Sequence, residues 1–450
     1  MLGINNDNIG TEISIALDLN QDIAFVEMVK CCTKHKDLHK GIIIHDAIVR
    51  RGLLEKSPYI ASALINMYAK SGVISKAMQV LEEISARNVV HWNALIAGYT
   101  QEGHVQGAIL CLSKMQHDGL SPDTITFILI LKACAKIKAV DVGEQIHEKI
   151  MEKNLLEKDI MLGNTLVDMY AKCGRLAKAK KVLEELPYRN VVSWNALISG
   201  YVQQEKCHEA LHYFQSMQRE GISPDAVTFV CVLQACGKTR CIDKGKQIHD
   251  VLVARGLLGK DIVLGNALLD MYVKCKDLSK ATQVLHELPV RDVVCWSALI
   301  SGYANHGHLE MAKHYFQKLW NEGIESDIIA FLSLIYACSH SGLLQEGCFY
   351  FRCMMEEFAL LPTMEHYACV IDMFGRAGLL NEAEDVIGKM PFAPDSVVWK
   401  ALLSSCVRHT NVNVGTRAFN ALLKFDCEHA AGYVLMSNIH VATTILSEDV

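Results

Sequence analysis

The stretch VVSWNALISGY, residues 191–201, decides how this sequence of 450 residues is organised. Two close relatives of it, VVHWNALIAGY and VVCWSALISGY, place tryptophans at a constant interval of 102 residues, at Trp92, Trp194 and Trp296. The motif DMYAK and its variants repeat at the same interval, and so does a longer motif that begins at Gly41, Gly143 and Gly245. A fixed internal period of this kind indicates a repeat architecture.

Each period divides into three units of 35, 36 and 31 residues. The same division covers most of the chain with consecutive units, namely 22–57, 58–88, 89–123, 124–159, 160–190, 191–225, 226–261, 262–292, 293–327, 328–363 and 364–395, followed by a helical tail at 396–450. Each unit has apolar residues at the spacing of two amphipathic helices. Because one helical hairpin cannot bury its apolar face alone, we predict an all-α fold, a right-handed α-solenoid superhelix of stacked two-helix repeats.

Composition limits the functions that the chain can have. It is 51% hydrophobic with a net charge of −6, and no apolar run approaches the ~18–20 residues that span a bilayer, so we predict no membrane partner. The 17 cysteines include no C-x-x-C pair, and we interpret them as small reduced hydrophobic residues. Residues 1–21 contain no Lys or Arg, so they are interpreted as an N-terminal remnant with no clear transit peptide.

One motif suggests zinc chemistry. His208-Glu209-Ala210-Leu211-His212 has the H-E-x-x-H spacing of a metallopeptidase helix. The corresponding segments of the sister units are QGAIL and EMAKH, which share only the alanine. We therefore interpret the motif as a coincidence of second-helix composition, and we predict no metal, no cofactor and no enzymatic activity.

The order of the unit lengths and the motifs VVSWNALISGY, LGNALLDMYVKC and MEHYACVIDMFGRAGLLNEAEDVIGKM together resemble the pentatricopeptide repeat (PPR) family of plants. The variant they resemble, the PLS subfamily, mixes P-type, long L-type and short S-type repeats. The resemblance covers about residues 22–440. It implies sequence-specific binding of single-stranded organellar RNA, one base per repeat.

The family reads a base with the fifth and the last residue of a unit, while the second residue, usually apolar, wedges between bases. Carried onto this sequence, the base-reading pairs are Ser62 with Asn88, Asn93 with Asp123, Asn164 with Asn190, Asn195 with Asp225, Asn266 with Asp292, and Ser297 with Asp327. By the family's code, residues 58–327 then specify 5′-A-U-n-Y-U-n-U-G-3′. The n positions face L-type units, whose fifth residues are apolar. The last residues could equally be helix N-caps, and the polar fifth residues could be solvated surface residues.

The net charge of −6 argues against a nucleic-acid ligand, but a row of cations offers a local positive surface. The thirteenth residue of a unit lies on the same helical face as the second, because eleven steps of 100° are close to three whole turns. At this position we predict phosphate contacts from Lys34, Lys70, Lys136, Lys172, Lys238, Lys274, Arg376 and Arg408, which we call the cation row.

The tail suggests a biological role. Relatives with a tail like residues 396–440 serve C-to-U RNA editing, often through a C-terminal zinc deaminase with the motifs H-x-E and P-C-x-x-C. This sequence has no P-C-x-x-C, and its tail departs from the family pattern at VATTILSEDV, so we interpret it as a truncated E-type tail. The expected function is a specificity factor in a mitochondrion or chloroplast that recruits a deaminase or editing-complex protein in trans. The alternative is a protein-binding helical-repeat scaffold.

Overall fold

The structure is a computed structural model that describes residues 21–425 and 430–448, and every regular element in those residues is a helix. The helices divide into two compact units, one up to Cys231 and the other from Val232 onward, with the division falling inside α14 (Ala226–Thr239). The predicted N-terminal remnant, residues 1–21, lies outside the described residues except for Gln21.

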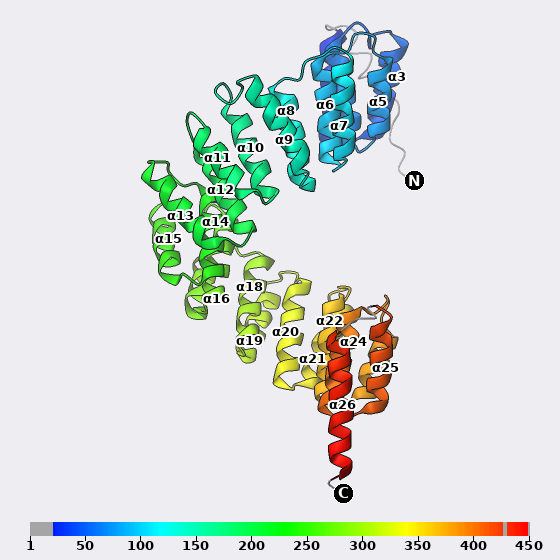
Figure 1. The fold of residues 1–450 in the computed structure, drawn as a ribbon, viewed down its shortest axis with the longest axis vertical. Coiled ribbons are helices and arrows are strands. Elements are labelled where there is room, and N and C mark those ends of the chain that lie inside the picture. The colour runs from blue at the N-terminus through cyan, green and yellow to red at the C-terminus, as the bar shows by residue number, and fades with distance from the viewer. Residues whose placement is uncertain (1–20, 426–429, 449–450) are drawn as a thin grey trace. The chain divides into compact units, whose positions relative to one another are not determined.

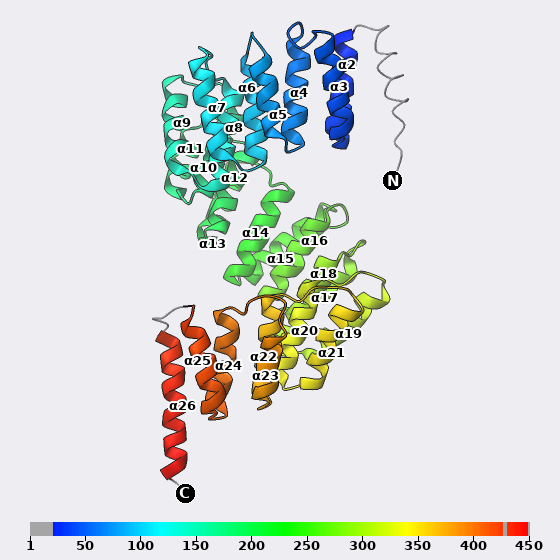
Figure 2. The same cartoon turned by 90° about the vertical axis from the view of Figure 1, so that its right-hand side faces the viewer.

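The first compact unit is a stack of helical hairpins (Figures 1 and 2). Its helices are α2 (Gln21–His35), α3 (Leu38–Arg50), α4 (Pro58–Lys70), α5 (Ile74–Glu83), α6 (Val89–Gln101), α7 (Val105–His117), α8 (Thr124–Ile137), α9 (Val140–Glu152), α10 (Ile160–Lys172), α11 (Leu176–Glu185), α12 (Val191–Gln203) and α13 (Cys207–Arg219). The first helix of each hairpin contacts the first helix of the next, from α2 through α12, so these helices form one continuous layer.

The second compact unit repeats this arrangement. Its helices after α14 are α15 (Ile242–Ala254), α16 (Ile262–Lys274), α17 (Leu278–Glu287), α18 (Val293–Asn305), α19 (Leu309–Asn321), α20 (Ile328–Ser341), α21 (Leu344–Glu356), α22 (Met364–Arg376), α23 (Leu380–Gly388), α24 (Ser396–Arg408), α25 (Val412–Leu423) and α26 (Ala430–Glu448). The first helices from α16 to α26 again contact one another in order. Each compact unit is therefore an α-solenoid, as the sequence predicts.

The first helices begin at the residues where the predicted repeats begin, because a polar side chain precedes most of them. This residue accepts a hydrogen bond from the first turn and so satisfies a backbone N–H that has no partner within the helix. The N-caps of this kind are Asn88, Asp123, Asp159, Asn190, Asp225, Asp261, Asp292, Asp327 and Asp395.

The motifs that recur every 102 residues pack against one another. A side-chain carbon at Gly143 on α9 would lie 2.6 Å from Sδ of Met169, and Nδ1 of His147 lies 2.9 Å from the hydroxyl of Tyr170. Gly200 on α12 likewise faces Ala171 on α10. These motifs recur at the same interval because their side chains pack against one another.

Within the described residues, no helix is long and apolar enough to cross a membrane. The cysteines of these residues form no disulfides with one another, and most of them are buried. Burial raises the pKa of Cys134 to about 11, so that its thiol stays protonated near neutral pH.

Candidate nucleic-acid interface

A row of exposed apolar side chains marks one face of the first helices. The second residues of the repeats are between 51% and 77% exposed, at Ile23, Tyr59, Val90, Ile125, Met161, Val192, Val227, Val263, Val294, Ile329 and Val397. Single exposed apolar residues are common, but the same exposed position in repeat after repeat is not. The exception is Glu365, which accepts a hydrogen bond from Thr363. The apolar row is available to the apolar faces of a ligand.

In most of the predicted base-reading pairs, the fifth and the last residue of a repeat lie in contact. In five of the six pairs the fifth residue donates a hydrogen bond to the side chain of the last residue, as Asn93 to Asp123 at 3.1 Å, Asn164 to Asn190 at 3.3 Å, Asn195 to Asp225 at 2.9 Å, Asn266 to Asp292 at 3.1 Å and Ser297 to Asp327 at 2.7 Å. The sixth pair differs, because Ser62 donates instead to the carbonyl of Pro58 in its own helix. Asn88, its predicted companion, accepts from His91.

Four of the six fifth residues are buried. Asn93, Asn164 and Asn195 are 7–8% exposed and Ser297 is 2% exposed. For these four residues, the interpretation as solvated surface side chains is therefore wrong. They lie at the base of the interface, where a buried polar group needs a hydrogen-bond partner.

The last residues have two roles. Asp225 accepts from the backbone N–H of Thr228 at 2.9 Å, as an N-cap does, and from the amide of Asn195 through the same oxygen, Oδ1. Burial alone would raise the pKa of Asp225, but the hydrogen bonds from Thr228 and Asn195 outweigh burial and hold the pKa below its usual value. The carboxylate is thus charged at neutral pH, and its second oxygen is left for a ligand.

Two of these pairs line one groove with a volume of about 590 Å³. Asn164 with Asn190 and Asn195 with Asp225 provide its polar groups, and its other walls include three members of the apolar row, Met161, Val192 and Val227. By contrast, the fifth residues of the L-type repeats, Val26, Ile128, Val230 and Leu332, offer no polar group. Along the groove, apolar surface therefore alternates with hydrogen-bond donors and acceptors.

All eight members of the cation row are exposed, but several have partners within the chain. Lys172 pairs with Asp168 at 2.8 Å, and Lys274 pairs with Asp270 at 2.6 Å. Lys136 donates to the carbonyls of Thr100 and Gln101 at the end of α6. The cation row is thus less free than the sequence predicts.

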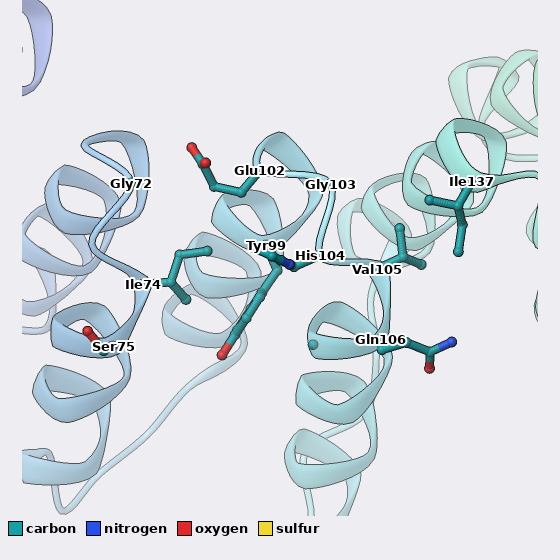
Figure 3. A pocket seen from close by; sticks show the side chains of 11 residues that line it. Gly72, Ile74, Ser75, Tyr99, Glu102, Gly103, His104, Val105, Gln106 and Ile137 are labelled. Atoms are coloured by element: carbon teal, nitrogen blue, oxygen red, sulfur yellow. The ribbon is translucent and has the colours of Figure 1, made fainter. Parts of the chain in front are cut away.

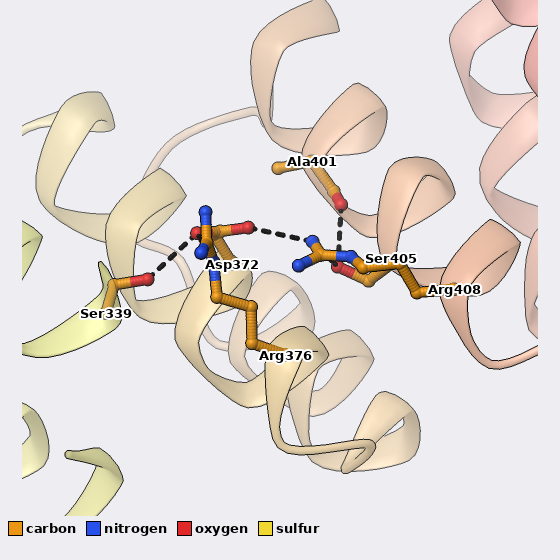
Figure 4. Close-up of polar contacts among 6 residues, drawn as sticks. All are labelled: Ser339, Asp372, Arg376, Ala401, Ser405 and Arg408. Carbon is orange, nitrogen blue, oxygen red and sulfur yellow. Dashed lines mark hydrogen bonds and ion pairs between the residues drawn. The ribbon is translucent and has the colours of Figure 1, made fainter. Parts of the chain in front are cut away.

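Two further members of the cation row share one acid (Figure 4). Arg376 donates to Asp372 at 2.6 Å and Arg408 at 3.1 Å, while Ser339 donates to the same carboxylate. Burial would raise the pKa of Asp372, but these three donors outweigh it and lower the pKa. Two positive charges and one negative charge leave this cluster with a net charge of +1.

Sequence reasoning missed Lys132 on α8. It is exposed, and among the described residues it has no ion pair or hydrogen-bond partner. It lines both the 590 Å³ groove and a neighbouring hollow of about 540 Å³ that also contains Lys136 and Lys172. Lys132 is the ninth residue of its repeat, on the same helical face as the fifth, and this spacing was the signal that could have found it.

A separate hollow of about 650 Å³ lies at the turns of α4–α5 and α6–α7 (Figure 3). It adjoins Gly107 and the ring of Tyr99, which occupies the space that a side chain at Gly107 would need. Sister repeats have Glu209 and Met311 at the position of Gly107. None of the predicted site residues lines this hollow.

The H-E-x-x-H histidines, His208 and His212, are exposed on α13. In the part of the chain that the structure describes, no group of three or more His, Cys, Asp or Glu residues could hold a metal ion.

The fold and this interface define a helical-repeat protein. The PPR repeat family matches residues 87–136 and 189–238, and the PPR repeat matches residues 59–89, 164–191, 266–293, 294–324, 329–357 and 365–392. A mitochondrial pentatricopeptide repeat-containing protein of Arabidopsis thaliana is 34% identical over 92% of this chain and 74% of its own length. The chain belongs to the PPR repeat family.

A second Arabidopsis thaliana relative of the same family is also 34% identical, over 93% of this chain and 65% of its own length. The chain thus spans about two thirds of the length of such relatives. The crystal structure of the pentatricopeptide repeat protein PPR10 from maize covers 97% of this chain and 64% of its own, with a TM-score of 0.74 and 18% identity. A second crystal structure, with a TM-score of 0.72, contains PPR10 in complex with an 18-nt psaJ RNA element. At this identity the likeness establishes the fold.

Proposed function

We propose that this chain binds single-stranded RNA in a sequence-specific way, with one base facing each repeat. The observation that carries the proposal is the groove in which the apolar row alternates with the base-reading pairs. Nucleobases have apolar faces that can stack on side chains such as Val192 and Val227, and polar edges that can reach Asn195 and Asp225. The complex of PPR10, which has the same fold, with an RNA element supports the choice of ligand.

The chemistry of the pairs supports the base preferences. Oδ1 of Asp225 is engaged by Asn195 and Thr228, so Oδ2 is left as an acceptor, beside the second N–H of Asn195. Uracil offers a donor at N3 next to carbonyl acceptors and matches this pattern, whereas cytosine has an acceptor at N3. In the pair Asn164 with Asn190 an amide replaces the carboxylate, so the last residue of this pair can donate as well as accept, and the pair suits either pyrimidine.

The finer role is part of the same proposal. We assign the chain to the PLS subfamily with an E-type tail, on the 35–36–31 order of its repeats and the tail motif. Its role is then to select a transcript in a mitochondrion or chloroplast for C-to-U editing or processing, with the catalyst supplied by a separate protein. The mitochondrial relatives support an organellar location.

Binding of a synthetic oligonucleotide tests the proposal. The purified chain should bind RNA containing 5′-A-U-n-Y-U-n-U-G-3′ at least about tenfold more tightly than RNA in which every named base is exchanged between purine and pyrimidine, because each mismatch costs about 1–3 kcal/mol. Fluorescence anisotropy at fixed salt measures both affinities. Equal affinity for the two RNAs would contradict base reading, and no affinity for either would favour the protein-binding scaffold.

The salt dependence of binding should distinguish the free cation of the groove from a paired one. Lys132→Gln should reduce the slope of log Kd against log salt concentration by about 0.7, the value for one phosphate contact to a single strand. The matched control is the double variant Lys172→Gln with Asp168→Asn, which removes an internal ion pair and should leave the slope nearly unchanged. Equal changes in the two variants would mean that Lys132 does not contact phosphate.

A further inference from the structure

A third residue accompanies most of the base-reading pairs. It is the third residue of the following first helix, and its side chain lies against the amide oxygen of the fifth residue before it. The contacts are Thr126 to Asn93 at 2.8 Å, Ser193 to Asn164 at 2.5 Å, Thr228 to Asn195 at 2.6 Å and Cys295 to Asn266 at 2.6 Å. Each of these four residues is 0% exposed, so a ligand in the groove cannot touch them.

The hydroxyl of Thr228 determines which way the amide of Asn195 points. The two ends of an Asn amide have nearly the same shape, so packing alone does not distinguish them. Thr228 places a donor beside one end, and the carboxylate of Asp225 places an acceptor beside the other. The reversed amide would bring its oxygen against the carboxylate and leave the hydroxyl without this acceptor, so one orientation is favoured.

We propose that the third residue of a repeat, where it contacts the Asn at the fifth position of the preceding repeat, is a positioning residue that decides how strictly that preceding repeat discriminates between bases. This inference rests on the proposed RNA-binding function. The buried hydroxyls of Thr126, Ser193 and Thr228 fix the amide edge that the base meets, and the repeats before them read strictly. The repeat that contains Asn266 reads less strictly, because Cys295 provides only a thiol, which is a weak donor.

The repeats that contain Asn266 and Ser297 fit this assignment. Burial raises the pKa of Cys295 to about 12, so the thiol keeps its hydrogen and remains a donor rather than a thiolate. Ser297 precedes a repeat whose third residue is Ala330, and its hydroxyl donates directly to Asp327. A serine has no amide to orient, so this repeat needs no third side chain.

The test is a pair of substitutions measured with two RNAs. Thr228→Val keeps the shape of the side chain and removes the donor, whereas Thr228→Ser keeps the donor. For each full-chain variant, anisotropy gives the affinity for the predicted target with U and with A at the base facing Asn195. Thr228→Val should reduce the U-to-A affinity ratio by about threefold to tenfold, the equivalent of one hydrogen bond, and Thr228→Ser should preserve the ratio. The same ratio at the base facing Asn93 should not change in either variant.

The reciprocal substitution should strengthen the base discrimination of a repeat instead of weakening it. Cys295→Ser replaces the thiol with a hydroxyl and should raise the U-to-A ratio at the base facing Asn266 by a similar factor. A purely structural role predicts equal affinity losses for all RNAs with unchanged ratios, and that result would overturn the inference. A wild-type chain without base preference would overturn the proposed function as well, whereas a wild-type preference that survives Thr228→Val would overturn this inference alone.

Discussion

Replacing Asn195 with serine is expected to change the preferred base at the fifth position of the target RNA from U to G, while the other positions keep their preferences. Asn195 is the fifth residue of its repeat, and its amide and Asp225 present the edge that suits uracil. Serine is shorter and leaves room for a purine, as in the pair of Ser297 with Asp327, where the hydroxyl donates to the carboxylate at 2.7 Å. The change at this one position should be on the order of 1–3 kcal/mol.

The fold should tolerate Asn195→Ser. Thr228 loses the amide oxygen as an acceptor but can donate to Asp225, 2.9 Å away, and the backbone cap of α14 by Asp225 is unchanged. The control is the same exchange of bases at the two n positions, which face Ile128 and Val230. These apolar residues leave no polar group unpaired when the base changes, so the cost there should be much smaller. Equal sensitivity at the n positions, or no shift with Asn195→Ser, would refute the one-base-per-repeat code for this chain.

The periodic part of the structure could be predicted from sequence. Helix starts, the hairpin pairing and the apolar row all follow from residues that recur at fixed intervals, since neighbouring repeats place equivalent residues in equivalent surroundings. The packing of Gly200 on Ala171 is an example, because the small residue recurs with the motif that carries it. The assignment of the fifth and last residues to one base came from the family resemblance, and the hydrogen bond between their side chains in five of the six pairs is a finding of the structure.

The network behind the base-reading pairs could not be predicted in the same way. Thr228 is the third residue of an apolar helix start, and nothing in its local pattern indicates that its hydroxyl reaches back to the previous repeat. The contacts of Lys136 with the carbonyls at the end of α6 also join two repeats, and such contacts depend on how the helices stack. The pair of Lys172 with Asp168 is different, because an acid four residues before a lysine can be read from the sequence.

Adding one methyl group at Gly200 should destabilise the solenoid far more than adding it at another helical glycine. The new carbon of Gly200→Ala would lie 2.4 Å from Cβ and 3.2 Å from Cα of Ala171, so α10 and α12 would have to separate. Overpacking of this kind costs about 1–3 kcal/mol. The midpoint of urea unfolding, followed by circular dichroism, should fall accordingly.

The matched control is Gly388→Ala at the end of α23, where the new carbon would meet no atom within 4 Å. Alanine restricts the unfolded chain more than glycine does, so this variant should keep or slightly raise the midpoint, by up to about 1 kcal/mol of unfolding free energy. Separation of α10 and α12 should also move Asn164 away from Asn195, because these helices carry the two base-reading residues of the groove. We therefore expect Gly200→Ala to weaken selectivity at the Y and U positions that face these residues, and Gly388→Ala to leave it unchanged. If the two variants unfold at the same urea concentration, Gly200 is not required for the close approach of α10 and α12.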